Sequence, residues 1–106
     1  MVFDIDNVLG GMKDAMKGEL DDDSGWEDIK DYWEEVLADR KEALRTIGDL
    51  RLQGALTNDE MEHELKQEKE TLEIQFLALK QMTKSLLQKM INAAMAALRK
   101  AILDLV

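Results

Sequence analysis

The chain has 106 residues and a formal net charge of −9, and it contains neither cysteine nor proline. This length fits a single domain over residues 1–106, and the lack of cysteine excludes disulfide bonds and thiolate metal sites. Good helix formers such as Ala, Leu, Glu, Lys and Met dominate the composition, and no stretch alternates between apolar and polar residues. The sequence therefore predicts an all-α fold.

The first predicted helix is short and covers about residues 3–17. Its apolar positions recur at helical spacing and form one stripe: Ile5, Val8, Leu9, Met12, Ala15 and Met16. Gly18 is expected to end this helix, and an acidic linker is expected over residues 18–24.

The second predicted helix covers about residues 25–53. Its expected buried face consists of Trp26, Ile29, Trp33, Val36, Leu37, Leu44, Ile47 and Leu50. Tyr32 lies outside this seam. That position makes Tyr32 the candidate in this helix for a contact with a partner protein.

A tight turn over residues 54–57 is predicted to join the second helix to a third. Gly54 can adopt the left-handed conformation that ends many helices. Thr57 and Glu60 have the spacing of a capping box, in which each side chain accepts a hydrogen bond from an N–H at the start of the next helix. The turn predicts an antiparallel helical hairpin.

The third predicted helix is very long and covers about residues 58–104, or ~70 Å at 1.5 Å per residue. The second helix is too short to cover all of it, and residues 86–106 are apolar over much of their circumference. The first helix, a second chain or a membrane surface would have to cover this stretch. Because the first helix presents only one stripe, we expect an oligomeric helical bundle. The expected interface residues are Leu86, Met90, Ile91, Met95, Leu98, Ile102 and Leu105.

One short motif allows a metal-binding alternative. Glu60 and His63 are three residues apart and therefore share a helix face, as in di-iron carboxylate bundles. The motif resembles that of encapsulated-ferritin-like hairpins, which implies a carboxylate and histidine site for iron or zinc across a dimer. Glu64 and Asp49 are the further weak candidates. Since the chain has one histidine and Glu60 already serves as a capping residue, we expect no metal or other cofactor.

Charge is distributed unevenly along the chain. Residues 1–64 carry 19 acidic and 7 basic side chains, whereas residues 65–106 carry 4 acidic and 7 basic side chains. The acidic part would repel phosphates, so nucleic acid is not expected as a ligand. The asymmetry has two interpretations. The acidic part of one chain could contact the basic part of another, or the two parts could simply be solvated faces that differ in charge.

The location expected from the sequence is cytoplasmic. No apolar run reaches the ~20 residues that a membrane-spanning helix needs, and the first residues are acidic where a secretory signal would be basic. Lysines beside the apolar C-terminal stretch make binding to a membrane surface a second alternative function. It ranks below oligomerisation, because anionic lipids would repel the acidic remainder of the chain.

The turn also carries a family resemblance. Residues 50–61, with the sequence LRLQGALTNDEM, resemble the turn of short SHOCT-type helical hairpins, although Leu65 stands where those hairpins usually have a lysine. The resemblance implies oligomerisation and supplies no catalytic residues. We therefore expect a non-catalytic assembly, adaptor or scaffold protein that associates with itself or with another helical protein.

Overall fold

A computed structural model describes residues 3–20, 23–76 and 83–106, and these residues form four helices and no strand. The helices are α1 (Ile5–Lys17), α2 (Asp23–Leu52), α3 (Asn58–Phe76) and α4 (Lys84–Leu105). The all-α prediction is confirmed. The bundle measures 41 × 22 × 21 Å.

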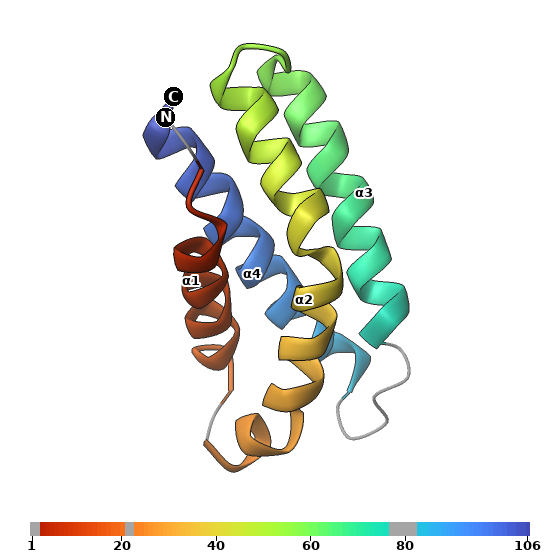
Figure 1. The fold of residues 1–106 in the computed structure, drawn as a ribbon. Helices are drawn as coiled ribbons and strands as arrows, with labels where there is room; N and C mark the ends of the chain where they lie inside the picture. The colour runs from red at the N-terminus through yellow and green to blue at the C-terminus, as the bar shows by residue number, and fades with distance from the viewer. Residues whose placement is uncertain (1–2, 21–22, 77–82) are drawn as a thin grey trace.

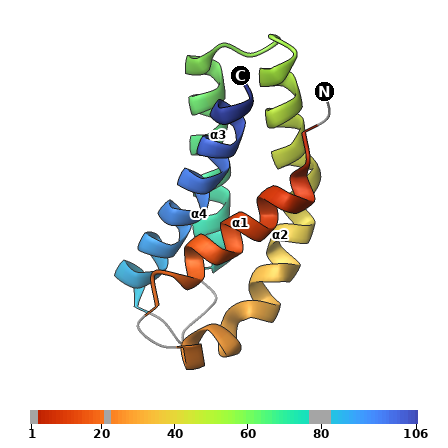
Figure 2. The same cartoon turned by 90° about the vertical axis from the view of Figure 1, so that its left-hand side faces the viewer.

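Successive helices run in opposite directions along the bundle (Figure 1). Viewed from the side, α1 lies across α4 and α2 (Figure 2). Helix α4 is in contact with each of the other three helices. Helix α2 likewise contacts the other three helices, and the contact between α1 and α4 is the most extensive of the bundle.

Local sequence signals explain the start and the end of α1. The Asp4 side chain accepts a hydrogen bond from the Asn7 N–H at 3.3 Å and caps the helix. The Gly18 N–H donates to the Asp14 carbonyl at 3.0 Å where the helix ends. Met12 and Met16, from the predicted stripe, are completely buried. The helix thus presents its apolar side to the bundle.

The turn between α2 and α3 has the predicted form. Gly54 has a φ of 79°, the Ala55 N–H donates to the Leu50 carbonyl at 2.8 Å, and the Gly54 N–H donates to the Arg51 carbonyl at 3.2 Å. These two bonds are the Schellman pattern of a helix end. The predicted hairpin turn is confirmed, because α3 begins directly after Thr57.

The prediction of one helix over residues 58–104 is wrong. Helix α3 ends at Phe76. Thr83 has an extended backbone (φ −69°, ψ 151°), and its side chain accepts a hydrogen bond from the Leu86 N–H at 3.2 Å. Thr83 is thus the N-cap of a separate helix, α4, which runs back along α3 (Figure 1). The chain folds back because α4 can then bury its apolar residues against the same chain.

The core extends through all four helices. Trp33 of α2 is fully buried and packs on Phe76 of α3, with ring centroids 4.9 Å apart. Each large apolar side chain that becomes fully buried contributes about 1.5–3 kcal/mol. The buried residues of α4 are Leu87, Met90, Ile91, Ala94, Met95, Leu98 and Ile102. This burial is the main physical reason why α4 packs against the other three helices.

Candidate functional site

The predicted interface of the C-terminal helix lies largely inside the chain's own core. Met90, Ile91, Met95, Leu98 and Ile102 are at most 7% exposed. Of the two remaining predicted residues, Leu86 is half-buried and Leu105 is 44% exposed. The expectation that this stretch is uncovered in a single chain is therefore corrected, because α1 and α3 supply the cover. A contact between copies through these residues stays a prediction and would require α1 to leave α4.

Glu60, the first of the metal-ligand candidates, is used to cap α3. Its Oε1 accepts a hydrogen bond from the Thr57 N–H at 2.9 Å, and the Glu60 N–H donates to the Thr57 Oγ1 at 3.2 Å. These contacts lower the pKa of Glu60. The hydrogen bond from the Thr57 N–H has the larger effect, and the hydrogen bond with the Thr57 side chain has the smaller one. The predicted capping box is confirmed.

The other three metal candidates do not gather around Glu60. The His63 ring lies 3.2 Å from the Gln67 amide nitrogen, while Asp49 accepts a hydrogen bond from the Phe3 N–H at 3.3 Å. Glu64 lines a groove between α2 and α3. Within the described ranges, no group of three or more His, Cys, Asp or Glu side chains is placed to hold a metal ion.

Tyr32 connects two helices of the bundle. Its hydroxyl donates to the Gln75 carbonyl at 2.5 Å, and its ring meets the Phe76 ring edge-on at a centroid distance of 5.4 Å. The side chain is half-buried. The predicted contact residue thus stabilises the packing of α2 against α3, and its contact with a partner protein stays a prediction.

Ion pairs join neighbouring helices around the bundle. Arg40 of α2 forms two hydrogen bonds with Glu68 of α3, at 2.9 and 2.5 Å, and this pairing raises the pKa of Arg40. Hydrogen bonding to Lys13 lowers the pKa of Glu34. Further interhelical pairs are Lys13–Glu34, Lys41–Asp6 and Arg99–Glu62. Of these pairs, Arg99–Glu62 joins a cation of residues 65–106 to an anion of residues 1–64.

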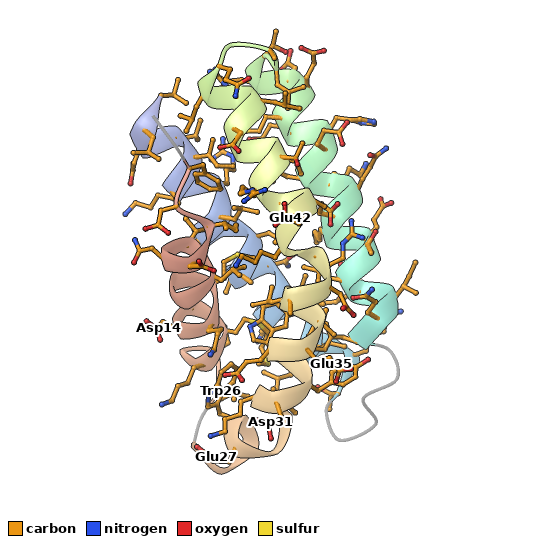
Figure 3. The ribbon with its side chains drawn as sticks, viewed as in Figure 1. Asp14, Trp26, Glu27, Asp31, Glu35 and Glu42 are labelled. Atoms are coloured by element: carbon orange, nitrogen blue, oxygen red, sulfur yellow. The ribbon has the colours of Figure 1, made fainter. Side chains whose placement is uncertain are left out.

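The outward face of α2 is acidic. Figure 3 shows Glu27, Asp31, Glu35 and Glu42 along this helix, and all four are exposed. Glu27 pairs with Lys30 at 3.0 Å and Glu42 with Arg45 at 2.5 Å, each within one turn of helix. These contacts fit the interpretation that this surface is a solvated helix face.

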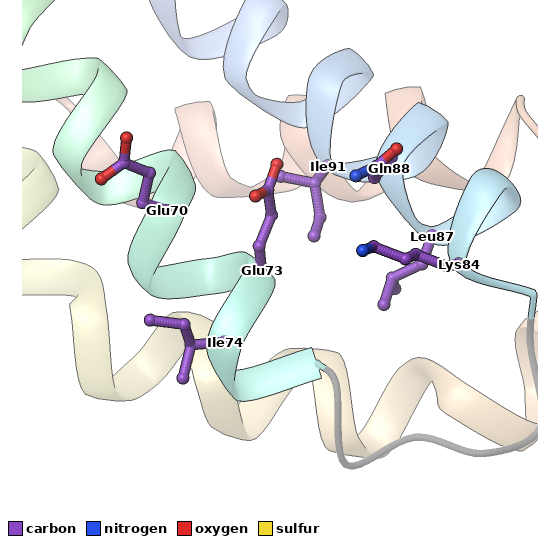
Figure 4. A pocket seen from close by; sticks show the side chains of 7 residues that line it. All are labelled: Glu70, Glu73, Ile74, Lys84, Leu87, Gln88 and Ile91. Atoms are coloured by element: carbon purple, nitrogen blue, oxygen red, sulfur yellow. The ribbon is translucent and has the colours of Figure 1, made fainter.

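A groove between α3 and α4 combines apolar and charged residues (Figure 4). It has a volume of about 360 Å³ and is lined by Glu70, Glu73, Ile74, Lys84, Leu87, Gln88 and Ile91. Leu87 and Ile91 are buried and form its floor, whereas Ile74 at its rim is 69% exposed. Among the described residues, Ile74 is the most exposed of the large hydrophobic side chains.

A second groove lies between the same two helices, nearer the start of α3. It has a volume of about 320 Å³ and is lined by Glu62, Leu65, Lys66, Lys69, Met95, Ala96 and Arg99. Together the two grooves form one surface, here called the α3–α4 face. The groove near Ile74 carries Glu70 and Glu73 of α3 and Lys84 of α4. The other groove carries Lys66 and Lys69 of α3, beside the ion pair of Glu62 with Arg99. The face therefore has apolar side chains in its depressions, and along α3 the order of its charged residues without an ion pair in the described part of the chain changes from basic (Lys66, Lys69) to acidic (Glu70, Glu73).

Ile74 is not among the residues predicted to form a site. Its exposure was nevertheless indicated by the sequence, because Leu65, Leu72 and Phe76 recur on one side of this helix and Ile74 lies outside that side. An isoleucine outside the buried rows of an amphipathic helix indicates an exposed apolar side chain. The grooves beside it could not be predicted, since they depend on the return of α4 along α3.

No family model matches the chain, and comparisons with curated proteins and with solved structures gave no match. No helix in the described part of the chain is long and apolar enough to cross a membrane.

Proposed function

We propose that the protein is a non-catalytic adaptor or assembly protein that binds a protein partner through the α3–α4 face. The observation that carries this proposal is Ile74, which is 69% exposed at the rim of a groove with an apolar floor. Protein interfaces typically bury exposed apolar side chains of this kind, and the charged residues around them set the choice and the orientation of the partner.

The charged groups support the same interpretation. The described residues whose pKa is shifted are Lys30, Glu34, Arg40 and Glu60, and each is accounted for by an ion pair or a helix cap. Catalytic sites more often combine a shifted pKa with a nucleophile or base in one cavity. The shifted groups of this chain instead lie in ion pairs and in one helix cap.

Site-specific photo-crosslinking tests the proposed function. A photoreactive residue at Gln88, which lines the groove, is expected to give defined protein adducts in cells, and Ile74→Asp is expected to abolish them. Placing the photoreactive residue at position 35 instead, on the exposed face of α2, is the positional control.

Val106→Asp is the control substitution for Ile74→Asp, because Val106 is also a largely exposed apolar residue (61%) and lies at the end of α4. Equal adducts at Gln88 and Glu35, or adducts that persist with Ile74→Asp, would contradict the proposal.

A further inference from the structure

We propose that the α3–α4 face binds a second copy of this chain, with α3 of one copy antiparallel to α3 of the other. This inference rests on the proposed function, in that the same face makes the contact, and it names the partner. The argument comes from the order of charges along α3 and from the position of Ile74.

The charges of α3 are self-complementary when the helix is reversed. Lys66 and Lys69 precede Glu70 and Glu73 along the helix, and the spacing places all four on one stripe. No ion pair joins any of these four to another residue in the described ranges. Their charges are thus available to an external partner.

A two-fold axis midway between residues 69 and 70 brings each of these lysines close to a glutamate of the other copy. It places Glu73 of each copy opposite Lys66 of the other, and Glu70 opposite Lys69. A contact related by a two-fold axis uses the same surface twice, so the two ion pairs occur in duplicate. A parallel arrangement would bring like charges together, and complementary charge therefore selects the antiparallel one.

The same register provides cover for Ile74. It brings Ile74 of one copy to the level of His63 and Gln67 of the other, on the outward side of α3. His63 and Gln67 are already held together at 3.2 Å, so that they present one continuous surface to an incoming side chain. The exposed isoleucine would then lose contact with water in both copies.

Sedimentation velocity between about 1 µM and about 1 mM, the range of weak and moderate interfaces, tests the proposal. We expect the native chain to form dimers within this range. Ile74→Asp should weaken the dimer about tenfold or more, because each dimer loses two apolar contacts. Val106→Asp, an equally drastic change outside the face, should leave the dimer unchanged.

Charge exchange tests the register itself. Glu73→Lys alone and Lys66→Glu alone should each weaken the dimer about tenfold, because each brings two like-charge pairs together. An equimolar mixture of the two variants should dimerise like the native chain, because the mixed pair regains both attractions. Helix content of each variant by circular dichroism shows that it is folded.

Two results would overturn the inference. One is a native chain that stays monomeric to about 1 mM at low salt, and the other is a mixture that associates no better than its components. If the chain is monomeric while Gln88 still crosslinks to another protein in an Ile74-dependent manner, the second copy is the wrong partner and the proposed function stands. If no Ile74-dependent adduct forms either, both proposals fail.

Discussion

The phenyl ring of Phe3 occupies the space in which a side chain at position 48 would begin. A Cβ atom on Gly48 would lie 2.3 Å from Cδ1 of that ring. Phe3 is only 1% exposed, and its N–H donates to Asp49 at 3.3 Å. This contact fastens the segment before α1 to α2. It also gives a reason for a glycine inside a long helix, where glycine costs about 0.5–1 kcal/mol relative to alanine.

Gly48→Ala is expected to destabilise the bundle by about 1–3 kcal/mol, because the new methyl group would displace the Phe3 ring. Urea unfolding measures the change. Gly11→Ala is the matched control, since a Cβ there meets nothing within 4 Å; it should stabilise the fold by about 0.5–1 kcal/mol. In a Phe3→Ala background, Gly48→Ala should lose most of its cost. Equal effects of the two glycine substitutions would refute the ring contact.

The ion pair between Arg40 and Glu68 is expected to matter more than the exposed pairs. Glu68 is 8% exposed, and both of its carboxylate oxygens accept hydrogen bonds from Arg40. Arg40→Met should cost about 1–3 kcal/mol, because it leaves a nearly buried carboxylate without its partner.

A double-mutant cycle isolates this interaction. Glu68→Leu combined with Arg40→Met should cost less than the two single changes together, because no unpaired charge remains. Arg45→Met, which breaks the exposed pair with Glu42, should cost at most about 1 kcal/mol. Strictly additive effects for Arg40 and Glu68 would show that the two side chains act independently.

The Glu60 cap predicts a pH dependence in the acid range. The pKa of Glu60 in the folded chain is lowered from its usual 4.5 by hydrogen bonds with Thr57. A lowered folded-state pKa gives stability that is present above about pH 4.5 and is lost as the pH falls through the folded-state pKa. An NMR titration of the Glu60 carboxyl carbon should therefore have its midpoint below 4.5. Thr57→Ala keeps the backbone N–H and removes the hydroxyl, so it should move that midpoint upward only in part. A midpoint at or above 4.5 in the native chain would argue against the cap.

Loosening α1 is expected to expose the apolar surface of α4. Met12 is completely buried on α1, so Met12→Asp should weaken the attachment of this helix by at least about 2 kcal/mol. The variant should bind an apolar dye and elute as larger species in size-exclusion chromatography. Asn7→Asp, on an exposed position of the same helix, is the control. A Met12→Asp variant that behaves like the native chain would show that α4 does not depend on α1 for its cover.

Part of the candidate site was visible in the sequence and part was not. The capping role of Glu60 follows from its spacing to Thr57, and the order of charges from Lys66 to Glu73 belongs to one helix. Both are local features. The two grooves and the burial of Met90 and Ile102 arise between α4 and helices distant in sequence, so periodicity within one helix could not predict them.

Local chemistry alone specifies the helical class, the stripe of α1 and the turn at Gly54, because propensity, capping and left-handed backbone are properties of neighbouring residues. The division between α3 and α4 was decided by packing in three dimensions. Residues 58–106 contain neither glycine nor proline, and the apolar spacing is the same whether a helix continues or folds back. A continuous helix of ~70 Å would have left the apolar side of residues 86–106 in water, whereas the antiparallel return buries it against α1, α2 and α3.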